Sequence, residues 1–274
     1  MKIPDIAFIG GGNMARSLIG GLLANGCPPD TLRVADPDPA QRQLLSDQLG
    51  VQVSADGRET ASQAQIVILA VKPQIVKQVA VTLAPVVQET RPLVISIAAG
   101  VRSTDIDRWL GGDVAIVRTM PNTPALVRSG ATALYANPAV SGERRQLAES
   151  VLRAVGLTVW VEEEGLLNSV TALSGSGPAY FFLIMEVLEN AGVSLGLSQR
   201  QARLLTLETA FGAAKMALES DESAAMLRAR VTSPGGTTER AIAVLQEGGL
   251  EALFSTALAA AKQRADELGD WLGD

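Results

Sequence analysis

A glycine-rich segment near the start of the chain has the pattern of a dinucleotide-binding turn. Gly10, Gly12 and Ala15 follow a short apolar run and precede a stretch with helical spacing. The first glycine permits a tight bend, the second lets the backbone approach a pyrophosphate, and the third small residue lets a helix pack on a strand. The helix start, with Asn13 and Met14, adds free N–H groups that attract an anion. We therefore predict a dinucleotide site here, in preference to a purely structural glycine turn.

Asp36 stands where the ribose of such a cofactor is usually recognised. It ends the second predicted strand, about 20 residues beyond the glycine turn. A carboxylate at this place binds ribose hydroxyls and repels a 2′-phosphate, which favours NADH. The alternative is that Asp36 only caps the turn before Pro37. Three arginines lie close enough in sequence to screen a phosphate: Arg33, Arg42 and Arg58. The sequence therefore leaves both NADPH and NADH open as the cofactor.

Three further segments close buried strands, and the carboxyl ends of strands are where open α/β sheets bind ligands. Val71, Lys72 and Pro73 follow one such strand, Ala98 ends the next, and Asn122 follows a third within a loop stiffened by two prolines. We assign all five residues to the cofactor cleft. The alternatives are an ordinary solvated side chain for Lys72 and a plain rigid turn for Asn122.

Two loops in the second half of the chain have backbone patterns that suit a ligand. Residues 174–178, Ser-Gly-Ser-Gly-Pro, break what would otherwise be one long helix, a costly arrangement for packing alone. Residues 233–238, Ser-Pro-Gly-Gly-Thr-Thr, precede a predicted helix. Their glycines expose N–H groups, the helix start adds partial positive charge, and the hydroxyls donate hydrogen bonds. We predict that the second loop binds a small carboxylate without help from a cation.

The residue types that the chain lacks restrict its chemistry. It has no histidine and one cysteine, Cys27. Ser-His-Asp and Cys-His nucleophile systems, His-ligated zinc, thiolate metal clusters and intrachain disulfides are therefore excluded, and we expect no metal. Hydride transfer fits this composition, because the cofactor carries the difficult step.

Charge and hydropathy restrict the partners. The net charge of −6 and the pI near 4.9 oppose a nucleic-acid-binding surface, which needs clustered Lys and Arg. Met1 and Lys2 begin no secretory pattern, and no stretch reaches the roughly 18 apolar residues that span a bilayer. We therefore expect a cytoplasmic protein with neither nucleic-acid nor membrane partners.

Strands and helices alternate through the first part of the chain. Predicted strands lie at residues 3–9, 31–35, 66–71, 93–98, 114–118, 131–135 and 157–161, and predicted helices at 13–25, 39–49, 75–87 and 103–110. This order is typical of the α/β class with a doubly wound parallel sheet, so we predict a Rossmann domain over residues 1–162.

Residues 163–274 are expected to form an all-helical domain. Ala, Leu, Glu and Gln at helical spacing predict helices at residues 165–191, 199–219, 222–229, 237–247 and 250–270. Residues 179–188 are apolar nearly all round, so their helix must be buried on more than one side. In so small a domain a partner subunit is the expected cover, with an internal core helix as the alternative. We expect a homodimer.

In their order, the motifs resemble those of the pyrroline-5-carboxylate reductase family, and the resemblance runs essentially end to end. It rests on Gly-Gly-Gly-Asn-Met-Ala at 10–15, Val-Lys-Pro at 71–73, Met-Pro-Asn-Thr-Pro at 120–124, Ser-Gly-Ser-Gly-Pro-Ala-Tyr at 174–180 and Ser-Pro-Gly-Gly-Thr-Thr at 233–238. The last of these is the C-terminal signature of the family. Together the five motifs are very specific.

The resemblance implies a Rossmann domain, a helical domain that interlocks with a second subunit, and dimers that often assemble into decamers. It also implies that NADPH or NADH delivers hydride to the C=N carbon of 1-pyrroline-5-carboxylate, giving L-proline in the last step of proline synthesis. Ser233, Gly236 and Thr237 would hold the substrate carboxylate, and Thr238, the catalytic residue, would hydrogen-bond the ring nitrogen. A protonated cyclic imine is already electrophilic, so no strong general acid is expected.

Two departures from the family pattern bear on the cofactor. Many bacterial relatives carry Asn-Arg, suited to a 2′-phosphate, where this chain has Asp36-Pro37. Many also carry Asn-x-Glu where this chain has Gly57-Arg58-Glu59, which removes an amide expected to face the adenosine ribose. Strict NADPH use is therefore not implied.

Two other functions compete with this interpretation. A β-hydroxyacid dehydrogenase shares the sheet-plus-helices plan, but its chemistry needs a lysine on the long helix after the Rossmann domain, and residues 165–191 contain none. A dinucleotide-sensing module would use residues 10–15 and leave residues 233–238 without a role.

Overall fold

The computed structural model describes residues 4–273, so the start of the strand predicted at residues 3–9 lies outside it. Within the described residues the chain forms two compact units. The first, called the sheet unit, consists of the chain up to Ser176 together with the chain from Ala261 onward. The second, called the helical unit, is Gly177–Ala260.

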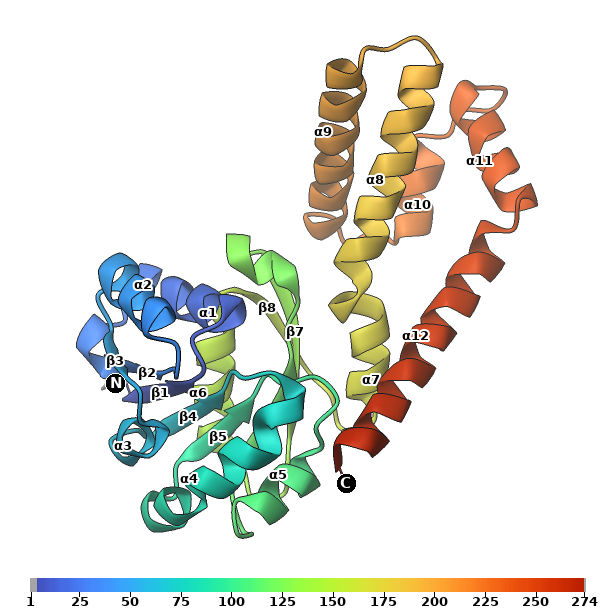
Figure 1. The fold of residues 1–274 in the computed structure, drawn as a ribbon. Coiled ribbons are helices and arrows are strands. Elements are labelled where there is room, and N and C mark those ends of the chain that lie inside the picture. The colour runs from blue at the N-terminus through green and yellow to red at the C-terminus, as the bar shows by residue number, and fades with distance from the viewer. Residues whose placement is uncertain (1–3, 274) are drawn as a thin grey trace. The chain divides into compact units, whose positions relative to one another are not determined.

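An eight-stranded sheet runs through the sheet unit in the order β3-β2-β1-β4-β5-β6-β7-β8 (Figure 1). Its strands are β1 (Ile6–Ile9), β2 (Leu32–Ala35), β3 (Gln52–Ser54), β4 (Ile66–Leu69), β5 (Leu93–Ser96), β6 (Ile116–Met120), β7 (Gly130–Ala136) and β8 (Gly156–Trp160). The order reverses between β1 and β4, as in doubly wound dinucleotide-binding folds. The predicted α/β class and Rossmann sheet are confirmed.

One strand pair departs from the predicted all-parallel sheet. β6 and β7 pair antiparallel, with Arg118 opposite Tyr135. β6 ends at Met120 and β7 begins at Gly130, which leaves too few residues for a parallel crossover of about a dozen or more. β8 then pairs parallel with β7 through a crossover helix over Gly142–Arg153 that the spacing did not predict.

Helices cover both faces of the sheet, which is why the central strands are continuous runs of Ile, Val and Leu. One core packs α1, α2 and α6 against the sheet, and the other packs α3, α4 and α5 (Figure 1). The helices and turns of this unit are α1 (Asn13–Ala24), η1 (Pro29–Thr31), α2 (Pro39–Leu49), α3 (Gly57–Ser62), η2 (Pro73–Ile75), α4 (Val76–Thr90), α5 (Ser103–Trp109), η3 (Thr123–Val127), α6 (Gly142–Arg153) and α7 (Leu166–Val170).

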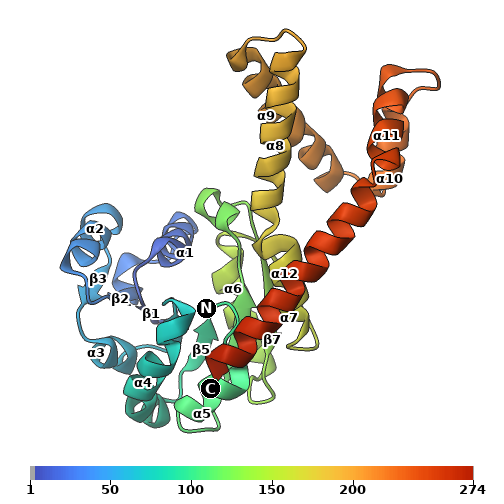
Figure 2. The ribbon, with the colours of Figure 1, turned by 45° about the vertical axis from the view of Figure 1, so that its right-hand side comes forward.

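The second half of the chain is helical, as predicted. The predicted break at residues 174–178 is confirmed, because a π-helical turn, η4 (Thr171–Gly175), separates α7 from the next helix. α8 (Gly177–Ser194) and α9 (Gln199–Leu218) of the helical unit lie side by side (Figures 1 and 2). The remaining helices are α10 (Ala224–Arg230), α11 (Thr237–Glu247) and α12 (Leu250–Gly273), the last of which continues into the sheet unit.

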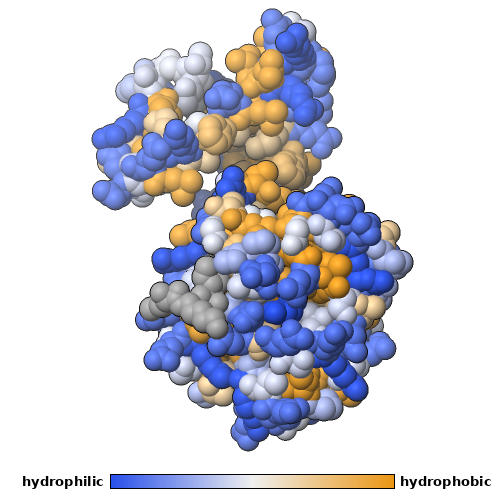
Figure 3. All heavy atoms as spheres, turned by 90° about the vertical axis from the view of Figure 1, so that its left-hand side faces the viewer, coloured by the Kyte–Doolittle hydropathy of each residue, from blue (hydrophilic) through white to orange (hydrophobic). Residues whose placement is uncertain are grey.

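The helical unit exposes much of its apolar surface. Phe181, Phe182 and Phe211 are each about two-thirds exposed, and Figure 3 shows apolar side chains gathered over this unit. By length and composition alone, Leu166–Ser194 is apolar enough to cross a membrane, so the expectation that no stretch qualifies is wrong. A helix that is covered by other protein segments has the same length and composition. The apolar residues on all sides of α8 also predict that protein covers this helix.

Candidate functional site

The turn between β1 and α1 has the geometry that the glycine pattern predicts. Gly10 has φ of +102° and donates its N–H to Ala35 O at 2.8 Å. A Cβ at this position would lie 2.5 Å from Ala70 O, so only glycine fits. Ala15 is buried against the sheet core. Packing within the protein thus explains why Gly10 and Ala15 are small residues.

Gly12 differs from Gly10 because no contact among the described residues requires a glycine there. It is the N-cap of α1, its φ of −65° is open to any residue, and a Cβ would meet no described atom within 4 Å. Among the described residues no side chain caps this helix start. The N–H groups of the first turn, including those of Asn13 and Met14, are therefore available for an anion.

The carboxylate of Asp36 lies beside this turn, at the end of β2. Its Oδ2 accepts the N–H of Gly11 at 2.8 Å, and its Oδ1 accepts the N–H of Asp38 at 2.9 Å. Arg42 Nη1 donates to the carbonyl oxygens of Asp36 and Pro37 at 2.7 and 2.9 Å. A turn-capping carboxylate and an anchored guanidinium therefore stand together where the cofactor ribose is expected.

The ends of β4 and β5 lie next to the glycine turn. Ala70 N donates to Ile9 O at 2.8 Å, and Ile97 N donates to Leu69 O at 3.2 Å. This ladder places the segments that follow, including Lys72 and Ala98, along one edge of the sheet. Val71 and Pro73 are partly exposed there, the Lys72 side chain is exposed, and Ala98 is buried.

Both the oxygen and the nitrogen of the Asn122 side-chain amide form hydrogen bonds to the backbone. Oδ1 accepts the N–H of Ala131 at 2.9 Å, and Nδ2 donates to Ser174 O at 3.1 Å. Met120 packs at the same place, since a Cβ on Gly175 would lie 2.5 Å from its Cε. The loop at residues 120–124 and the π-helical turn, predicted as separate motifs, are thus joined within the sheet unit.

The loop at residues 233–238 belongs to the helical unit. Gly235 has φ of +70°, and Gly236 is the N-cap of α11. Two N–H groups are already used, since Gly236 N donates to Ser233 O at 3.0 Å and Gly235 N to Glu239 Oε2 at 2.7 Å. No described side chain caps α11. The N–H groups of its first turn, beginning with Thr237, are left for a ligand.

A buried ion pair near the end of β8 was not predicted from the sequence. Glu164 Oε1 accepts Arg118 Nη1 at 3.1 Å and Ser103 N at 2.6 Å, while Oε2 accepts Ser103 Oγ at 2.7 Å. The Arg118 side chain is 5% exposed. Burial lowers the pKa of this guanidinium, and the charge of Glu164 opposes that shift. Glu164 therefore joins β6 to the start of α5, next to the β5–α5 loop.

We expect Glu164→Gln to lower the free energy of unfolding by about 3 kcal/mol, because it leaves the buried Arg118 charge without a counter-ion. Chemical denaturation measures this change. Glu163→Gln alters an exposed neighbour and should stay within about 0.5 kcal/mol of the unmodified protein. Equal stability of the two variants would contradict a structural role for the pair.

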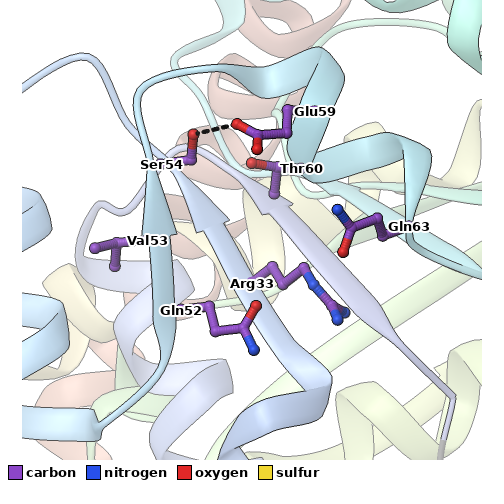
Figure 4. Close-up of a pocket in the computed structure, with 7 residues that line it drawn as sticks. All are labelled: Arg33, Gln52, Val53, Ser54, Glu59, Thr60 and Gln63. Atoms are coloured by element: carbon purple, nitrogen blue, oxygen red, sulfur yellow. Dashed lines mark hydrogen bonds between the residues drawn. The ribbon is translucent and has the colours of Figure 1, made fainter.

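A shallow pocket lies between the edge strands and α3 (Figure 4). Ser54 Oγ donates to Glu59 Oε2 at 3.2 Å across its rim. Its lining residues are Arg33, Gln52, Val53, Ser54, Glu59, Thr60 and Gln63. None of them is among the assigned site residues, although Arg33 is one of the arginines considered for a 2′-phosphate. We assign the pocket no function.

Two family models match the chain. Residues 164–268 match a model described as pyrroline-5-carboxylate reductase dimerisation. Residues 5–100 match a model described as NADP oxidoreductase, coenzyme F420-dependent.

Individual relatives match over their whole length. The pyrroline-5-carboxylate reductase of Pseudomonas aeruginosa is 50% identical over 273 residues, which cover 100% of both chains. The solved pyrroline-5-carboxylate reductase of Coxiella burnetii is 50% identical, with a TM-score of 0.95 over 97% of this chain and 99% of that one. The Plasmodium falciparum pyrroline carboxylate reductase with NADP bound is 27% identical, with a TM-score of 0.86 over 98% and 99%.

Proposed function

Since the chain belongs to the pyrroline-5-carboxylate reductase family, we propose that it reduces 1-pyrroline-5-carboxylate to L-proline with NADPH or NADH. The observation that carries this proposal is the 50% identity to a named reductase across the full length of both chains. The two backbone anion sites, at the starts of α1 and α11, supply what a dinucleotide and a small carboxylate each need.

The residues of the β1–α1 turn fit a dinucleotide. Gly12 leaves open space where a pyrophosphate must approach, and the uncapped first turn of α1 offers N–H donors. When bound, NAD(P)H supplies the hydride that adds to the C=N carbon. We assign cofactor contacts to Gly10, Gly12, Asn13, Met14, Ala15, Asp36, Val71, Lys72, Pro73, Ala98 and Asn122.

The loop at residues 233–238 is assigned to the substrate. Ser233, Gly236 and Thr237 hold the carboxylate, and the Thr238 hydroxyl hydrogen-bonds the ring nitrogen. Gly236 N is engaged with Ser233 O, so the open amides that support this role begin at Thr237. The chain has no histidine, and a protonated imine accepts hydride without a strong protein acid. The work of the protein is orientation.

Domain organisation and assembly extend the proposal. We assign residues 1–162 to the dinucleotide domain and 163–274 to a substrate and dimerisation domain, supported by the dimerisation model at residues 164–268. The exposed apolar side chains of α8 and α9 support a homodimer built through these helices. A decamer assembled from such dimers is tested by light scattering, and its location in the cytoplasm by cell fractionation.

We expect Asp36→Asn to shift the preference from NADH toward NADPH. The amide oxygen can still accept the N–H of Gly11, while the charge that repels a 2′-phosphate is gone. The ratio of kcat/KM for NADPH to that for NADH should rise about tenfold, a change of roughly 1.4 kcal/mol. Steady-state kinetics with both cofactors measures this ratio, and an unchanged ratio would show that Asp36 only caps the turn.

The function itself is tested by adding 1-pyrroline-5-carboxylate to the protein with NADPH or NADH and following absorbance at the nicotinamide band. We expect oxidation of the cofactor and formation of L-proline. A dinucleotide sensor would bind the cofactor without turnover, and a β-hydroxyacid dehydrogenase would ignore the imine while oxidising hydroxy acids. Either outcome would overturn the proposal.

A further inference from the structure

The β5–α5 loop is held by residues from the far end of the chain. Ala98 in this loop is assigned to the cofactor, and Gly100 follows it with φ of +81°. The last turns of α12 lie against the loop within the sheet unit. A Cβ on Gly100 would lie 3.1 Å from Leu272 Cδ1 and 3.8 Å from Gly269 N. The backbone of the loop and the end of the helix are therefore in van der Waals contact.

Gly269 has a specific reason to be glycine. A glycine inside a helix costs about 1 kcal/mol relative to alanine, yet α12 carries one at a buried position. A Cβ there would lie 3.2 Å from Gly100 O, closer than such contacts normally come. By contrast, a Cβ on Gly20 of α1 would meet no described atom within 4 Å. The close approach of α12 to the loop thus depends on the missing side chain.

Polar contacts fix the same end of α12. Arg102, at the end of the loop, forms an ion pair with Asp270. Arg108 Nη2 donates to Gly273 O at 2.7 Å, and Asn168 Nδ2 donates to Asp266 Oδ1 at 2.6 Å. The Arg102 pair joins the end of α12 to the loop, and the Arg108 and Asn168 bonds join it to α5 and α7.

We propose that the C-terminal end of α12 positions the β5–α5 loop for the cofactor, with Gly269 and Leu272 as positioning residues. The proposal rests on the proposed function. The loop follows β5, and β5 lies next to β4 in the sheet. β4 in turn lies next to β1, the strand that precedes the glycine turn. Because packed interiors do not absorb small displacements, a shift of α12 moves the loop backbone, and misplacement by even 1 Å can cost about 100-fold in rate.

The test is a graded series, Gly269→Ala and Gly269→Leu, with Gly20→Ala as the matched control. NAD(P)H affinity is measured by fluorescence titration, which needs no turnover, and kcat and both KM values are measured separately. We expect the Kd for NAD(P)H to rise about fivefold for Gly269→Ala and more for Gly269→Leu, with lower kcat. The KM for pyrroline-5-carboxylate should change less than twofold, and Gly20→Ala should match the unmodified protein.

A second variant covers the case in which added volume prevents folding. Leu272→Ala removes the contact with the loop without adding atoms, and it should raise the cofactor Kd severalfold. Lower thermal stability with unchanged cofactor Kd and kcat in both Gly269→Ala and Leu272→Ala would overturn the proposal. Failure of the proposed function would look different, because the unmodified protein would then bind NAD(P)H without reducing the imine.

Discussion

Gly12→Ala is expected to weaken NAD(P)H binding about 100-fold while the protein stays folded. The backbone of Gly12 is ordinary, and a methyl group there would meet no described protein atom within 4 Å. The stability cost should therefore be that of a poorer helix N-cap, within about 1 kcal/mol. The methyl group would instead occupy the space through which a pyrophosphate reaches the start of α1. Fluorescence titration and thermal unfolding measure the two effects separately.

Gly20→Ala again serves as the control, because it adds a methyl group to the same helix where none of the described atoms is near. Gly10→Ala is a poor probe by comparison. Its φ of +102° and the 2.5 Å approach to Ala70 O would damage the fold and the site together. Cofactor affinity in Gly12→Ala equal to that of Gly20→Ala would place the pyrophosphate elsewhere.

Thr238→Ala is expected to lower kcat about 100-fold, the usual cost of losing one hydrogen-bonding group aimed at the reacting atoms, while the Kd for NAD(P)H stays near its original value. Thr238 lies in the first turn of α11, in the helical unit, whereas the cofactor residues belong to the sheet unit. Its loss should therefore affect the imine nitrogen and not the dinucleotide. Single-turnover kinetics with saturating cofactor measures the chemical step.

Thr232→Ala is the matched control for this variant. The Thr232 hydroxyl donates to Arg228 O of α10 at 2.6 Å and is not part of the assigned site. We expect its kcat to remain within about twofold. Equal losses of turnover and cofactor affinity in Thr238→Ala would count against the assigned role, and retention of activity in Thr238→Ser would support the hydroxyl.

Local patterns were enough to predict the parts of the fold that depend on short-range sequence. The apolar strands, the glycine turn and the helix break at residues 174–178 all follow from periodicity and backbone chemistry. The three-residue strand β3 was missed because so short a run carries no periodic signal. The antiparallel β6–β7 pair was also missed, although the short connection from Met120 to Gly130 rules out a crossover.

Contacts between distant segments could not be predicted from the sequence. Glu164 is bonded to Ser103 and Arg118, and no local pattern reports that proximity. Asn122 was identified, but its bonds to Ala131 and Ser174 were not. A glycine at position 269 inside a strong helical pattern was a usable signal for close approach, since such a residue weakens the helix that contains it.

The most direct test of the proposed site is a crystal structure of the protein with oxidised cofactor and L-proline bound. We predict that the proline carboxylate accepts hydrogen bonds of about 3 Å from the open amides at the start of α11, beginning with Thr237. The proline Cδ, the ring carbon that was part of the C=N bond, should face C4 of the nicotinamide. The pyrophosphate of that cofactor should lie on the turn at residues 10–15. A carboxylate bound elsewhere, or two loops that do not approach each other even across subunits, would contradict the proposed mechanism.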